Sequence, residues 1–399
     1  MSSSMYSERG GPINDPLSFL GDWLHEAPVL KRIELPCTPQ LWTSRFLQDL
    51  TYLDVDDSTD YGFSDVCELL QALERMPALQ VLRLVSSGIL SRRSPRPSLV
   101  LSDVHLSELQ EIELFDSQSN LTDLLVHLRF PSSTQITLTC RGGNGNDVDF
   151  SDILSALSNG SHFSQCNASM KVGSPLATRA LRISPNSSNK YGNRIQFEAW
   201  SEDPDALEDL QPKALCLATN PRVRLLFYWN SPLAEPHVFQ TVTAAVRKAL
   251  FCQNLNLMIL LDPTTTRHEW VQQRSSYLAV LKEFETSPAL HSIFTSGMYM
   301  EPLLTLLDSA TGSEQTGTRK PFPALRKVWF HDADFTGYAA GRGSIIDPHS
   351  LLQDTVKGRL LDVLCISSAF GWTKGHTRLV QEYVTTLVWD GVEGEVVAC

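Results

Sequence analysis

The sequence lacks any long apolar run: no window approaches the 18 or more apolar residues that a membrane-spanning helix needs. Its first residues, Met-Ser-Ser-Ser-Met-Tyr-Ser-Glu-Arg, lack the apolar core of a secretory signal peptide. We therefore expect a protein of the cytoplasm or nucleus that has no membrane partner.

Basic residues are also few, since 33 Lys and Arg stand against 45 Asp and Glu, for a net charge of −12. A nucleic-acid-binding surface needs a clustered basic face. The one local cluster, Arg92-Arg93 with Arg96, lies among Ser and Pro, as a solvated loop does. The composition therefore predicts that no nucleic acid is bound.

No two of the eight cysteines form a Cys-x-x-Cys pair, so a structural zinc site has no support. The cysteines are scattered and mostly flanked by apolar residues. This is typical of buried free thiols in a reducing compartment.

Catalytic motifs are missing as well. The glycines at 142–145 are not followed by the Lys-Ser or Lys-Thr of a phosphate-binding loop. The helix of a zinc protease needs a second histidine four residues after His268, but Gln272 stands there. Residues 331–334, His-Asp-Ala-Asp, follow a strand as a polar turn does, and residues 341–344 do not match a nucleophile elbow. We therefore predict no enzyme, no cofactor and no metal, with an enzyme of unrecognised residues as the third hypothesis on function.

The strongest pattern present is a repeated frame, Pro-x-Leu-x-x-Φ-x-Φ, in which Φ is apolar. The final two apolar residues have strand spacing, and proline disfavours helix in the residue before it. The segments upstream, such as Val66, Leu69, Leu70 and Leu73, have helical spacing. The frame occurs complete at Pro28, Pro77 and Pro323, degraded at Pro131 and Pro288, and without proline at Leu50 and Leu109.

The spacing of the copies predicts the fold class. The first leucines at 30, 50, 79 and 109 are 20, 29 and 30 residues apart, close to the period of about 20–29 residues in leucine-rich repeats. We therefore predict an α/β fold, a degenerate leucine-rich-repeat solenoid with a curved parallel sheet and helices on its convex side. The consensus turn position carries short hydroxyl residues, which are also ordinary turn formers after strands: Thr38, Ser58, Ser87 and Ser117.

The organisation along the chain follows from the same pattern. We expect a disordered tail at 1–15 and a single solenoid over 16–399, least regular at about 141–200, with a polar linker at about 309–321. Residues 141–149 are expected to form a loop, and strands are expected at 181–183 and 195–197. The continuous apolar run at 255–261 predicts a strand covered on both faces. An inserted unit in the middle third stays open.

Residues that alternate with the core leucines are expected to point outward onto the concave face of the sheet. This face would carry charged and aromatic side chains, and Tyr, Trp and Arg dominate binding hot spots. Solvated strand residues, or aromatics covered by loops, are the alternative interpretation. The candidate residues for binding a protein partner of unknown identity are Arg32, Tyr52, Asp54, Arg83, Glu113, Phe115, Trp329 and His331.

Four segments carry a family resemblance: Ala27–Leu30, Leu121–Cys140, Phe322–Phe335 and Trp389–Glu393. Together they resemble the mushroom-type fungal family of F-box/leucine-rich-repeat-like proteins. The resemblance implies that an F-box docks a Skp-type adaptor of a cullin ubiquitin ligase while the repeats present a substrate. The repeats begin by residue 30, so the F-box itself is not evident in this chain, and the adaptor is a partner only if an F-box lies upstream. We therefore predict a non-catalytic interaction module that serves as the substrate-recognition part of such a receptor, or alternatively a stand-alone scaffold.

Overall fold

The structure is a computed structural model. It describes residues 31–36, 47–56, 66–85, 102–144, 149–160, 178–188, 192–201, 220–230, 236–261, 267–308, 320–336, 338–340, 344–359 and 361–391. The expected tail at 1–15, the turn residues Thr38, Ser58 and Ser87, and most of the linker at 309–321 lie outside them.

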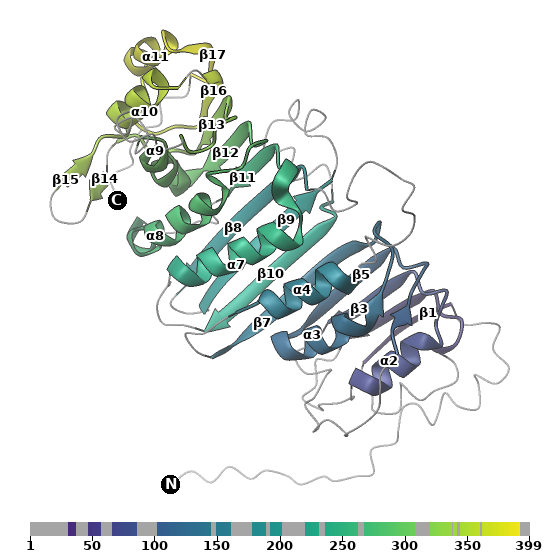
Figure 1. Ribbon diagram of the computed structural model, residues 1–399. Helices are drawn as coiled ribbons and strands as arrows, with labels where there is room; N and C mark the ends of the chain where they lie inside the picture. The colour runs from purple at the N-terminus through teal and green to yellow at the C-terminus, as the bar shows by residue number, and fades with distance from the viewer. Residues whose placement is uncertain are drawn as a thin grey trace, which may run out of the picture.

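One open, mostly parallel sheet of 13 strands organises the described part of the chain (Figure 1). The strands follow one another across the sheet in the order β1-β2-β3-β5-β7-β10-β9-β8-β11-β12-β13-β16-β17. Their bounds are β1 Arg32–Pro36, β2 Tyr52–Asp56, β3 Val81–Val85, β5 Glu111–Ser117, β7 Gln135–Asn144, β8 Ala180–Ser188, β9 Gly192–Trp200, β10 Val223–Asn230, β11 Leu257–Leu260, β12 Ser292–Ser296, β13 Lys327–His331, β16 Leu361–Ser367 and β17 Val384–Trp389.

The described helices form a row along one face of this sheet, each in contact with the next (Figure 1). They are α2 Val66–Glu74, α3 Gln118–His127, α4 Ser151–Gly160, α7 Pro236–Ala249, α8 Arg267–Phe284, α9 Met300–Asp308, α10 Pro348–Lys357 and α11 Lys374–Gln381. Two small sheets lie beside the row: β4 (Val104–His105) pairs with β6 (Leu128–Arg129), and β14 (Tyr338–Ala340) pairs with β15 (Ser344–Ile346). No described helix is long and apolar enough to cross a membrane.

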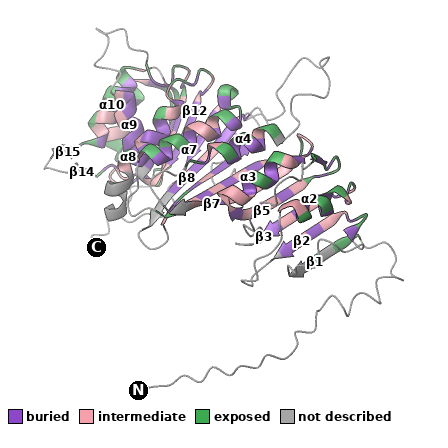
Figure 2. Ribbon diagram, turned by 60° about the horizontal axis from the view of Figure 1, so that its bottom comes forward, coloured by how far each residue is buried: buried purple, intermediate pink, exposed green. Residues whose placement is uncertain are grey.

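The repeated frame produces the core between the sheet and the helices. In β3, the inward Leu82 and Leu84 are buried while the residues between them are half-exposed, as their period of two predicts. Leu53, Leu82 and Ile112 stand in register on three neighbouring strands, and each contributes roughly 1.5–3 kcal/mol when buried. Figure 2 shows the buried residues on the strands and on the sheet-facing sides of the helices.

The turn position is described in one repeat only. Ser117 ends β5 and is the N-cap of α3, where its Oγ accepts a hydrogen bond from Asn120 N at 3.5 Å. A short hydroxyl residue therefore connects strand to helix here. This is expected both for the turn of a leucine-rich repeat and for an ordinary turn after a strand.

The middle of the sheet differs from the prediction of a sheet that is parallel throughout. Strands at 181–183 and 195–197 are confirmed as parts of β8 and β9, but β9 runs antiparallel to both of its neighbours. Only residues 189–191 connect β8 to β9, and a parallel crossover needs a dozen residues or more. The chain therefore leaves β7 through α4, forms the antiparallel meander β8-β9-β10, and proceeds through α7 to β11.

Two local predictions have opposite outcomes. The predicted loop at 141–149 is wrong in its first part, because β7 continues to Asn144 and Arg141 pairs with Ser117 of β5. The strand covered on both faces is confirmed, because all four residues of β11 are buried. Its outer face packs in a second apolar cluster on the side of the sheet away from the helices.

Candidate functional site

The helix-free face is the side of the 13-stranded sheet opposite the row α2 to α11, the side on which none of the described helices lies. One row of side chains, here called the central row, runs in register across this face from edge to edge. Its first eight positions are charged or polar and its last five are apolar. The members are Glu34, Asp54, Arg83, Glu113, Thr137, Arg224, Glu198, Arg182, Ile259, Phe294, Trp329, Cys365 and Val388.

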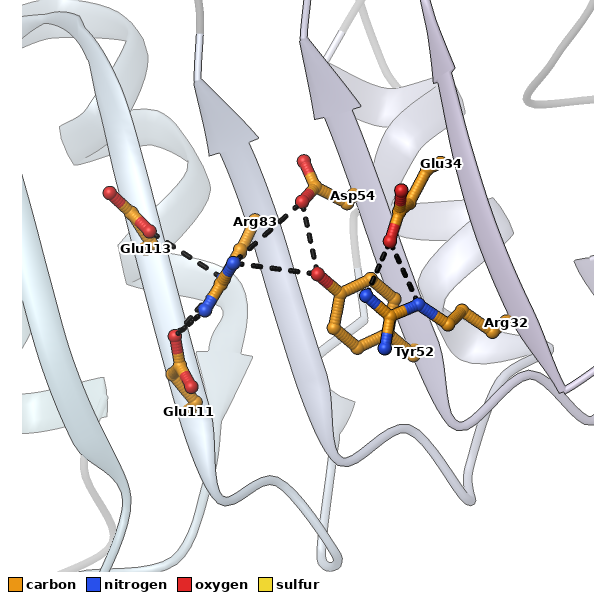
Figure 3. Close-up of polar contacts among 7 residues, drawn as sticks. All are labelled: Arg32, Glu34, Tyr52, Asp54, Arg83, Glu111 and Glu113. Atoms are coloured by element: carbon orange, nitrogen blue, oxygen red, sulfur yellow. Dashed lines mark hydrogen bonds and ion pairs between the residues drawn. The ribbon is translucent and has the colours of Figure 1, made fainter.

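Arg83 is the centre of a charged cluster at the N-terminal end of this face (Figure 3). Its Nη2 lies 2.7 Å from Glu111 Oε1, and its Nε lies 3.6 Å from Glu113 Oε2. Its Nη1 lies 3.9 Å from Asp54 Oδ2 on the other neighbouring strand and donates to Tyr52 Oη at 3.4 Å. The hydrogen bond to Glu111 raises the pKa of Arg83, so this group keeps its positive charge.

Tyr52 connects Arg83 to the strand at the edge of the sheet. Its hydroxyl donates to Asp54 Oδ2 at 3.1 Å, and burial, followed by this bond, raises the pKa of Tyr52. The guanidinium of Arg32 stacks on the Tyr52 ring, 3.9 Å from its centre, and donates from Nε to Glu34 Oε1 at 2.8 Å. The charged cluster is therefore the seven residues of Figure 3, and its four carboxylates outnumber its two guanidinium groups.

A buried ion-pair group lies further along the central row. Glu198 is almost fully buried and accepts a hydrogen bond from Arg224 Nε at 2.9 Å and another from Gln196 Nε2 at 2.9 Å. It also forms an ion pair with Arg182 on its other side. Two arginines therefore compensate one buried carboxylate at the border between the polar and apolar parts of the row.

The apolar patch lies on the helix-free face next to this border, mainly on β8, β9, β11, β12 and β13. It consists of the buried Ala180, Trp200, Leu257, Ile259 and Phe294, with the partly buried Leu261 and Trp329 packed against them. His331 lies at its side, with its ring 6.1 Å from that of Phe294 and its Nδ1 2.9 Å from Ser367 Oγ. Burial raises the pKa of Cys365, which pairs with Trp329 in the sheet.

The structure brings together only part of the predicted binding set. Five residues belong to the charged cluster: Arg32, Tyr52, Asp54, Arg83 and Glu113. Phe115 lies outside it, beneath the guanidinium of Arg141 at 4.5 Å. Trp329 and His331 are separated from β5 by six strands; Trp329 is half-buried at the apolar patch, and His331 lies beside it.

Sequence reasoning did not identify the buried Glu198 group. Its signal was present, because Ile195 and Phe197 were recognised as a strand pair and Gln196 and Glu198 alternate with them. The polar turn expected at residues 331–334 is confirmed, since Asp332 follows β13 with φ of 52°.

Two hollows lie at the carboxyl ends of β5, β7 and β10. One, of about 450 Å³, is lined by Phe115, Arg141, Gly142, Tyr228, Trp229 and Asn230. The other, of about 730 Å³, follows the start of α3 and shares Arg141 and Gly142 with the first. Within the described ranges, no three His, Cys, Asp or Glu side chains gather as metal ligands would.

Comparison with protein-family models and with curated proteins finds no match to this chain. The chemistry of the helix-free face therefore carries the functional argument. Charges held in fixed positions beside aromatic rings suit recognition of another polar surface.

Proposed function

We propose that the chain is a non-catalytic interaction module that binds a protein partner through its helix-free face. The charged cluster around Arg83 is the observation that carries this proposal. Parallel sheets almost always have both faces covered, whereas the described helices cover one face only. The other face presents half-exposed charged and aromatic side chains in fixed positions, which lowers the entropy lost on binding.

The charge of the cluster indicates the chemistry of the partner. Four carboxylates surround two guanidinium groups (Figure 3), so a partner surface with lysine or arginine side chains gains attraction there. The chain as a whole has a net charge of −12, which favours the approach of the same class of partner.

The finer fold is part of the proposal. We infer a degenerate leucine-rich-repeat solenoid, with the helix-free face as its concave side and the meander β8-β9-β10 as an inserted unit. The 20- to 30-residue spacing of the frame supports this. The in-register apolar stack through Leu53, Leu82 and Ile112 and the row of successive helices also support it.

Site-specific photo-crosslinking tests the binding face. A crosslinking amino acid replaces Val81, which lies between Tyr52 and Glu111 on the helix-free face, and the matched control replaces Val126, an exposed valine of α3. We expect a specific crosslinked protein from position 81 that disappears when Arg83→Glu is added. Equal products from both positions, or none from position 81, would refute the proposal.

The resemblance to F-box/leucine-rich-repeat-like proteins supports a more specific role, the substrate-recognition part of a ubiquitin ligase receptor in the cytoplasm or nucleus. This role is supported by the resemblance of three segments to that family: Leu121–Cys140, Phe322–Phe335 and Trp389–Glu393. Co-precipitation of the full-length gene product with a Skp-type adaptor is the expected result. A stand-alone scaffold, the alternative, recovers the protein partner but never the adaptor.

A further inference from the structure

The two edges of the 13-stranded sheet differ in how they are protected. The edge strand β1 reads Arg-Ile-Glu-Leu-Pro, and its charges and proline discourage pairing with another strand. The opposite edge strand, β17, reads Val-Thr-Thr-Leu-Val-Trp. It has no charge and no proline and is rich in β-branched residues, so it is well suited to accept a further strand.

Exposed apolar side chains gather at the same end of the molecule. The described residues include five large apolar residues that are exposed, and three of them lie here: Phe370, Leu379 and Val388. Val388 is 50% exposed and is the last member of the central row, while Leu379 is 54% exposed on the last helix, α11. Most of the other exposed residues at this end, such as Lys374, Glu382 and Thr385, are polar, so the apolar exposure is confined to these three side chains.

The backbone of β17 is oriented for pairing. Asp390 N donates to Ile366 O of β16 at 3.4 Å, so the backbone groups of even-numbered residues face β16. Successive residues of a strand direct their backbone groups to opposite sides. The N–H and C=O groups of Thr385 and Leu387 therefore face the side of β17 on which no described strand pairs.

We propose that a second copy of this chain binds at this edge, with the two β17 strands antiparallel about a two-fold axis. Because the strand carries no charge, pairing it with its own copy brings no like charges together. The two-fold arrangement closes on itself, whereas pairing β17 with β1 would build an open fibre. The charges of β1 and its Pro36 disfavour that fibre.

The dimer also covers the exposed Val388. Joined about an axis perpendicular to the sheet, both copies keep their helices on the same side. The α11 helices, which contact β17, then approach each other, and the apolar ends of the two central rows meet near Val388. This dimer does not depend on the proposed partner at the charged cluster, which lies at the other end of the sheet.

Sedimentation velocity of the full chain, from about 1 to 100 µM, measures the association. We expect a dimer that Val388→Lys weakens by at least about tenfold, because the lysine places a charge at the shared edge. The matched control, Val126→Lys, changes a similarly exposed valine of α3 and should leave the dimer intact. Thr385→Pro is the second variant, since it removes an edge-facing amide without adding charge.

Circular dichroism first confirms that each variant is folded. Loss of the dimer in a folded Val388→Lys or Thr385→Pro variant supports the proposal. A wild-type chain that stays monomeric at the highest concentration overturns it, and so does a dimer that both variants leave intact. If the intact chain is a monomer and dimerises only after removal of residues 392–399, that segment occupies the edge of β17, and the proposal is also overturned.

Discussion

Glu198→Ala should cost far more stability than removal of an exposed glutamate from the same face. The Glu198 side chain is only 2% exposed and lies between Arg182, which is mostly buried, and Arg224. The substitution removes the carboxylate and leaves the guanidinium of Arg182 desolvated without its counter-charge. Breaking a buried ion pair in this way costs about 3–5 kcal/mol, which is the loss in free energy of unfolding that we expect.

Glu34→Ala is the matched control, because Glu34 is 57% exposed and pairs with the exposed Arg32. A surface pair of this kind contributes about 0–1 kcal/mol. Urea denaturation at pH 7, followed by circular dichroism, measures both losses. Glu198→Gln should fall between the two alanine variants, since it keeps the side-chain volume and one hydrogen-bond acceptor but loses the charge.

The dependence on salt concentration further distinguishes the loss of the buried ion pair from the loss of the exposed one. Raising the ionic strength to about 1 M should reduce the small effect of Glu34→Ala and leave the effect of Glu198→Ala almost unchanged, because buried pairs are screened less. Losses for the two alanine variants that agree within about 0.5 kcal/mol would refute the buried carboxylate and the strand register that places it there.

Three further predictions test other parts of the fold. Leu82→Asp should unfold the N-terminal strands of the sheet, because an unpaired charge replaces a fully buried leucine; unchanged thermal stability would contradict the register of β3. Burial, and then the neighbouring His376, lowers the pKa of His349 to about 4, below about 6.5 in the unfolded chain. The unfolded state therefore binds more protons as the pH falls from about 6.5 to 4, and stability decreases; His349→Phe should lessen that decrease in urea titrations, and an unchanged pH dependence would count against it. Burial raises the pKa of Cys252 to about 12, so mass spectrometry should find its thiol alkylated in urea but not in the native protein; rapid native labelling would contradict its burial.

The local parts of the fold were predictable because they depend on local periodicity. In β3, β5 and β13, alternation in the sequence identified which residues are buried, such as Leu82 and Val328, and which face the other way, such as Arg83. The charged cluster follows directly, since residues at equivalent frame positions on adjacent parallel strands stand side by side. The four predicted binding residues of the cluster on β2, β3 and β5, which are Tyr52, Asp54, Arg83 and Glu113, needed only that rule.

The order and direction of the strands in the sheet, and the burial of side chains on the helix-free face, could not be predicted from local periodicity. Periodicity shows that Ile195 and Phe197 share a face, but strand direction depends on the length of the connection to β8. For Trp329, alternation indicated the helix-free face, but its burial depends on Phe294 of the neighbouring strand and on other members of the apolar patch, which come from separate parts of the sequence. The buried Glu198 group needs β8, β9 and β10 to be in place, so no single segment of the sequence reveals it.

The meander β8-β9-β10 separates strands that each pair with the preceding strand of the sheet from a block of strands that must form together. From β1 to β7, each strand of the 13-stranded sheet pairs with the strand that precedes it in that sheet, so a strand with its helix could be deleted or duplicated without changing the kind of neighbour that any strand meets. Between β7 and β11 this modularity ends, because Ile136 pairs with Val223 and Met258 pairs with Leu181 across long stretches of chain. These pairings require closure of long loops before they stabilise anything. The middle of the protein should therefore fold and evolve as one block, while single strands with their helices are gained or lost on its N-terminal side.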